Sequence, residues 1–130
     1  MAVMAALPRP GLAAQRKSLS LPWPELVEQL TETLGRKLVA YIAGKKDVRA
    51  VDRWIAGGSA YRDVEARLRF TFHVVGTLLE HDSAQVVQAW LVGVNPELGD
   101  RVPIRMLRDG DPDVIGSQIL AAVRAYIAGA

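Results

Sequence analysis

Apolar residues recur every three to four positions along most of this chain, and proline or glycine bounds nearly every such run. This spacing places apolar side chains on one face of an α-helix, and no segment keeps the alternation of a half-buried strand for long. Because proline favours helix starts and glycine favours helix ends, the pattern predicts short helices joined by tight turns. The sequence therefore predicts an all-α fold.

Seven helical segments follow from these apolar faces and their bounds. The longest has one inward stripe that includes Tyr61, Leu68 and Phe72, and Phe70 and Val74 widen it, so we expect both sides of its second half to be covered. The expected helices cover residues 24–34, 38–42, 48–55, 61–79, 84–91, 103–107 and 112–130.

Composition restricts the class of protein further. The chain has 130 residues and no cysteine, so it has neither a disulfide framework nor a thiolate metal site. No apolar run reaches the roughly 18 residues that would cross a bilayer, and the N-terminus is a poor signal peptide. We expect a cytoplasmic protein with no membrane partner, a flexible tail over residues 1–20, and two helical regions over 21–67 and 68–130.

Charge is distributed unevenly between the two halves. Residues 1–69 hold twelve Lys and Arg residues against seven Asp and Glu, whereas residues 70–130 hold four against seven. A basic first half and an acidic second half suggest different partners. Ordinary surface variation explains a difference of this size about equally well.

The first half, over residues 21–67, contains a candidate helix-turn-helix made by the expected helices 38–42 and 48–55. Ala40 is the small residue at a close helix crossing, Gly44 is the turn glycine, and Val51 and Trp54 are the expected buried positions of the second helix. The side chains expected to face outward are Lys45, Lys46, Arg49, Ala50 and Arg53.

The four basic residues of that set, Lys45, Lys46, Arg49 and Arg53, are the predicted DNA contacts. They would neutralise phosphates, and Arg49 could reach a guanine edge. Arg62, Arg67 and Arg69 would extend this face, while Asp52 would repel phosphate. A helix-turn-helix can also serve only for dimerisation or packing, so this reading stays open beside DNA binding.

A run of turn-forming residues, NPELGDRVPIRMLRDG, precedes the last helix. Asn95-Pro96 favours an extended residue followed by a turn, Leu98 can anchor the loop, and Gly99 permits positive φ. The planar guanidinium of Arg101 could then lock the loop by binding carbonyls or a nearby carboxylate. On these residues alone, a rigid loop holding two helices is the favoured explanation.

The same run resembles the C-terminal domain of the Xre–MbcA–ParS antitoxins, in which an N-P-x-L-x-x-R-x-P-x-x-L-L-x-x-G-like stretch precedes a terminal helix. Matching positions here are Asn95, Pro96, Leu98, Gly99, Arg101, Pro103, Leu107 and Gly110. Met106 stands where leucine is usual, and Asp100 replaces a glycine. The resemblance covers about residues 68–130, and the helix-turn-helix extends it over most of the chain beyond residue 20.

The resemblance implies a partner and a mechanism. Antitoxins of this family form dimers that sequester an NAD-consuming RES-domain toxin through the C-terminal region, bind their own operator DNA, and need no cofactor. Carried over to this chain, it implies a toxin-binding surface at the loop and on two outward-facing residues of the last helix. The residues concerned are Asn95, Pro96, Leu98, Arg101, Gln118 and Arg124.

Catalytic readings have little support in the sequence. His73, Glu80, His81 and Asp82 form the one tempting cluster, but His73 and His81 are eight residues apart, so their directions on a helix diverge. No serine stands in a nucleophile elbow, and Gly57-Gly58 is a helix stop. We expect no enzyme, no metal and no cofactor. The alternatives to an antitoxin are a helix-turn-helix regulator or adaptor without a toxin, and a purely structural oligomer.

Overall fold

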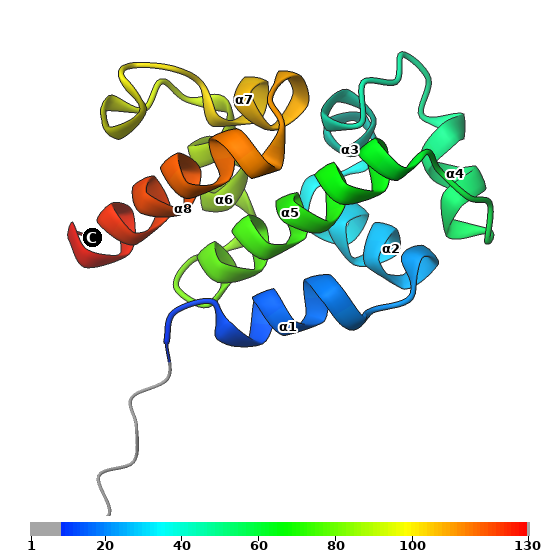
Figure 1. Cartoon of the computed structure of the whole chain (residues 1–130), viewed down its shortest axis with the longest axis horizontal. Helices are drawn as coiled ribbons and strands as arrows, with labels where there is room; N and C mark the ends of the chain where they lie inside the picture. The colour runs from blue at the N-terminus through cyan, green and yellow to red at the C-terminus, as the bar shows by residue number, and fades with distance from the viewer. Residues whose placement is uncertain (1–8, 130) are drawn as a thin grey trace, which may run out of the picture.

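The computed structural model describes residues 9–129, and all regular secondary structure in that range is helical, as predicted (Figure 1). The helices are mostly short, and proline stands in the first turn of α2, η1, α7 and α8. The elements are α1 (Leu12–Ser20), α2 (Trp23–Leu34), α3 (Arg36–Ile42), α4 (Arg49–Ile55), α5 (Arg62–Leu79), α6 (Ala84–Val92), the 3-10 turn η1 (Pro96–Leu98), α7 (Pro103–Asp109) and α8 (Pro112–Gly129).

Helix α5 crosses the middle of the molecule and packs against α1, α2 and α8 among others (Figure 1). Leu68, Val74 and Leu78 on this helix are each at most 1% exposed. Phe70 is half-buried, and its ring packs against Gly116 of α8. A Cβ added to Gly116 would lie 3.2 Å from the nearest ring carbon of Phe70. The predicted covering of both sides of α5 is confirmed.

The boundary predicted between residues 67 and 68 falls inside α5, and one buried cluster contains side chains from both regions. Direct contacts also join them: Gln88 of α6 donates to the Thr33 carbonyl of α2 at 2.7 Å. Arg108 of α7 lies 4.5 Å from the ring centroid of Tyr41 on α3. The two predicted regions therefore share one core, which periodicity along the chain cannot reveal.

Residues 12–20 form α1, so the prediction of a flexible tail through residue 20 is wrong for this part; residues 1–8 lie outside the described range. The buried residues of α1 are the small Ala14 and Ser18, and no stripe of large apolar residues marks the helix in the sequence. Ala14 packs against Gly76 of α5, where an added Cβ would approach the Ala14 Cβ to 2.7 Å. Small residues on both helices permit this close approach.

Polar groups hold α1 on α5 at both ends. The Arg69 guanidinium donates from one nitrogen to the carbonyls of Ser18 and Leu21, each at 3.0 Å. At the other end, the Gly11 backbone N–H donates to the Glu80 carboxylate at 3.0 Å. Because these bonds satisfy backbone groups at the two ends of α1, they fix its position along α5.

The two short helices predicted around residue 44 are present as α3 and α4. Gly44 has φ 75°, and the Lys45 N–H closes the turn on the Ala40 carbonyl at 2.8 Å. Val51 and Trp54 are at most 1% exposed, as predicted. Trp54 packs against Trp23 of α2 with ring centroids 5.6 Å apart.

Replacing Arg69 with Met tests the clamp on α1. This change keeps most of the aliphatic stem but removes the donors to Ser18 and Leu21, and we expect the free energy of unfolding in urea to fall by about 2 kcal/mol. Limited proteolysis should also cut between α1 and α2 sooner. Arg62→Met, on the exposed first turn of α5, is the matched control and should change stability by less than about 0.5 kcal/mol. Equal losses in the two variants would contradict the clamp.

Candidate functional site

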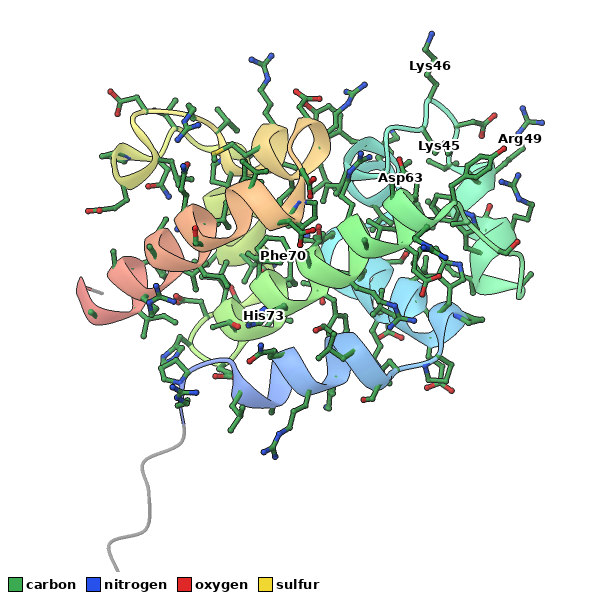
Figure 2. The ribbon with its side chains drawn as sticks, viewed as in Figure 1. Lys45, Lys46, Arg49, Asp63, Phe70 and His73 are labelled. Carbon is green, nitrogen blue, oxygen red and sulfur yellow. The ribbon has the colours of Figure 1, made fainter. Side chains whose placement is uncertain are left out.

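The four predicted DNA-contact residues lie on the turn between α3 and α4 and on α4 itself. Lys46, Arg49 and Arg53 are exposed, and Lys45 is half-buried. Figure 2 shows Lys45, Lys46 and Arg49 at one end of the molecule, with Lys46 and Arg49 extended away from the ribbon. Ala50, expected to face outward, is instead 8% exposed and belongs to the core.

Carboxylates partly occupy this basic surface. Asp47 accepts from the Arg49 backbone N–H at 2.8 Å, and its other oxygen accepts from Arg49 Nε at 2.8 Å. The side-chain hydrogen bond from Arg49 holds the pKa of Asp47 below its ordinary value. Asp52, expected to repel phosphate, is paired with Arg36. Lys46 and Arg53 are thus the exposed cations of the predicted set with no ion pair inside residues 9–129.

Lys45 and Arg53 line one hollow of about 330 Å³, together with Ser59 and Tyr61. The sequence placed Tyr61 on the buried stripe of the following helix, but its side chain is 78% exposed. Tyr61 is the extended residue just before α5, with ψ 152°, so the helical spacing does not apply to it. Its aromatic ring and the Ser59 hydroxyl are surface groups that the sequence reading missed, although both directly follow the glycine stop.

Two arginines expected to extend the basic face have structural roles instead. Arg67 donates to the Ile42 carbonyl at the end of α3 at 3.3 Å, and Arg69 holds α1 on α5. Arg62 alone of the three is exposed. The basic surface therefore ends near the start of α5.

The loop from Asn95 to Arg101 closes on itself. The Asn95 N–H donates to the Arg101 carbonyl at 3.0 Å, and the Asn95 side chain accepts from the Glu97 N–H at 2.9 Å. Leu98 is 1% exposed and anchors the loop in the core. Asn95 and Leu98 were predicted to contact a partner, but they are buried, so within this loop Pro96 and Arg101 are the predicted contacts that reach the surface.

Two consecutive residues in this loop have left-handed backbone conformations. Gly99 has φ 65°, and Asp100 has φ 62°, the one positive φ of a non-glycine residue between residues 9 and 129. Asp100 thus has a backbone conformation that glycine adopts without strain. The chain reversal is therefore made by one glycine and one aspartate.

Arg101 joins the loop to α8. Its Nε donates to the Leu98 carbonyl at 2.7 Å, and its terminal nitrogen donates to the Gln118 side-chain carbonyl at 2.8 Å. The carbonyl partner that the sequence suggested is confirmed, whereas no carboxylate in the described range binds Arg101. Arg124 does not join this group: it lines a different groove, beside α1 and α5.

A groove of about 450 Å³ adjoins the loop on the side of α6 and α8, and we call it the partner groove. Its walls include Trp90, Val94, Pro96 and Tyr126, and alanines and glycines make much of the rest. Val94 is 65% exposed, which is high for a valine beside a concave surface. Trp90 and Tyr126 were predicted as core residues; they pack against the core but are only half-buried, and both line the groove.

The cluster considered for catalysis has internal partners. Glu80 accepts from the Gly11 N–H, and Asp82 accepts from the Tyr126 hydroxyl at 2.7 Å. No group of three or more His, Asp or Glu side chains within residues 9–129 is placed to hold a metal ion. None of the helices in that range has the length and apolar character needed to traverse a bilayer.

Comparison with known proteins adds no family: no protein-family profile, curated protein or solved structure matches the chain.

The left-handed Asp100 provides a test of the loop. Asp100→Val should lower the free energy of unfolding in urea by about 1–2 kcal/mol, because a β-branched residue is strained at positive φ. Asp100→Asn should stay within about 0.5 kcal/mol, since asparagine tolerates this region. Asp109→Val, at an exposed residue without positive φ, is the control. If Asp109→Val lowers the free energy of unfolding as much as Asp100→Val does, backbone strain at residue 100 is not the cause.

Proposed function

We propose that this protein is an antitoxin-like protein that binds and neutralises a protein toxin through the partner groove and binds DNA through the turn between α3 and α4. The observation that carries the proposal is the closed loop of residues 95–101 beside the partner groove. Its resemblance to the antitoxin family is a resemblance in sequence, and the toxin expected on that basis is an NAD-consuming enzyme of the RES type.

The partner groove has the chemistry of a protein-binding surface. Trp90 and Tyr126 line the groove, Val94 adds exposed apolar area, and Arg101 is exposed on the adjoining loop, outside the groove lining. Aromatic side chains and arginine are enriched where interfaces are tightest. Since the loop bonds to itself and to α8, it loses little conformational freedom on binding, which favours affinity.

DNA binding rests on a separate observation, the exposed cations at the far end of the molecule. Lys46 and Arg53 are unpaired within the described range, and the exposed Tyr61 stands beside Arg53 in the hollow. Exposed cations are suited to a phosphate backbone, and a tyrosine hydroxyl beside them can donate a hydrogen bond to it. If a toxin is absent, this surface supports the second candidate function, a helix-turn-helix regulator or adaptor of the same fold.

The toxin arm is tested by co-expression with the product of the neighbouring open reading frame, measuring growth, cellular NAD and co-purification. We expect the neighbour alone to arrest growth and deplete NAD, and the pair to grow and co-purify. Val94→Asp should weaken the complex by about tenfold or more, because a carboxylate is placed in an apolar contact. Val114→Asp is the matched control, as Val114 is 68% exposed on α8 outside the groove. A harmless neighbour that does not co-purify would contradict the toxin arm.

The DNA arm is tested by the salt dependence of binding to the DNA upstream of the gene. We expect steep weakening with salt, and Lys46→Gln and Arg53→Gln should each reduce the slope of log affinity against log salt by about one. Arg16→Gln, an exposed arginine on α1, should leave the slope unchanged. If the Lys46→Gln, Arg53→Gln double variant binds DNA as tightly as wild type, the proposed DNA binding is contradicted. The proposed toxin binding is not affected by that result.

A further inference from the structure

A second groove lies between the start of α1, the second half of α5 and the middle of α8, at the end of the molecule away from α4 (Figure 1). Its volume is about 490 Å³, within the range of small-molecule sites. We call it the arginine groove, and its lining includes Arg9, Leu12, His73, Leu120, Val123 and Arg124.

The arginine groove has an unbalanced positive charge. Arg9 and Arg124 are exposed, neither forms an ion pair within residues 9–129, and no aspartate or glutamate lines the groove. Residues 1–8 contain no acidic side chain that could pair with them. Glu80, the residue after α5, does not line the groove, but its charge acts on His73 and persists while the carboxylate accepts the Gly11 N–H; it offsets part of the charge of the two arginines.

Apolar side chains from α1 and α8 line the same groove as the two arginines, together with the polar Gln15 and Thr77. Leu12 and Leu120 are half-buried, and Val123 is 1% exposed. The wall formed by α1 is fixed, because a Cβ on Gly11 would overlap the Thr77 side chain and the chain there turns at φ 80°. The groove thus has both charged and apolar side chains in its lining. They come from α1, α5 and α8 and are in place before any ligand binds.

We propose that the arginine groove binds a small amphipathic anion, whose charged head lies between Arg9 and Arg124. The head is a carboxylate or a phosphate, since the planar guanidinium binds both through paired hydrogen bonds. The apolar body of the ligand lies on Leu12, Leu120 and Val123. This site is independent of the partner groove and of the basic surface, and it gives Arg124 a role other than toxin contact.

His73 reports on the site. It is half-buried on α5 and lines the groove, and Figure 2 shows it on the same helix as Phe70. Burial lowers its pKa, while Glu80 acts in the opposite direction. Arg9 and Arg124 are the cations that face the groove with it. An anion bound beside the imidazole stabilises its charged form, so ligand binding should raise the pKa of His73.

The test uses the full chain and three eight-carbon probes: octanoate, octyl phosphate and the uncharged octanamide. Amide and imidazole NMR signals are followed during titration, and calorimetry gives the Kd. We expect saturable shifts at His73 and Leu120 with at least one anion, a Kd about tenfold weaker for octanamide, and a raised His73 pKa in the complex. The tighter of the two anions identifies the head group as carboxylate or phosphate.

Charge-removing variants complete the test. Arg124→Gln and Arg9→Gln should each weaken binding of the tighter anion by about tenfold, while circular dichroism shows an unchanged fold. Arg105→Gln is the matched control, because Arg105 is an exposed arginine on α7 outside the groove. Three outcomes would each overturn the proposal. Octanamide could bind as tightly as the anions, the arginine variants could bind like wild type, or neither anion could give a saturable shift.

Discussion

The burial of α5 on several faces at once is the interaction on which the other helices depend. Helices α3, α4 and α7 have seven residues each, and a helix of this length is unstable in water unless it is packed. Helices α3 and α7 pack on α5 directly, whereas α4 packs on α2 and α3, and α2 in turn packs on α5. The position of every surface described above, whether on the α3–α4 turn or beside α8, is set by how its helix packs in this shared core.

Arginine does two different things in this molecule, and local contacts decide which. Arg69, Arg67 and Arg101 donate to backbone carbonyls at helix ends or in a loop, where they satisfy acceptors that the helices leave open. Arg53 and Arg124 are exposed and have no carboxylate partner in the described part of the chain. A count of basic residues therefore overstates the surface able to bind an anion.

Helix spacing and Pro/Gly punctuation were sufficient to predict α2 through α8, because large apolar residues mark their buried faces. They failed for α1, whose contact with α5 uses Ala14 and Gly76, since small residues carry no periodic signal. They also failed for Tyr61, which precedes its helix. The turn residues of the loop correctly predicted Leu98 as its anchor, whereas the family motif assigned partner contacts to Leu98 and Arg101 alike, although Arg101 is exposed and Leu98 is buried. That distinction, and the separation of Arg124 from Gln118, required coordinates.

The passage of α5 through the expected domain boundary has a consequence for how the two ends of the protein can work together. With no linker between them, the α3–α4 turn and the partner groove are both positioned by helices packed in one core. Two large ligands bound at the same time would then have one relative orientation, set by the core that the two surfaces share. Whether the second ligand can bind then depends on whether the two ligands clash or contact each other. Coupling between the two binding events therefore needs no conformational change in the protein.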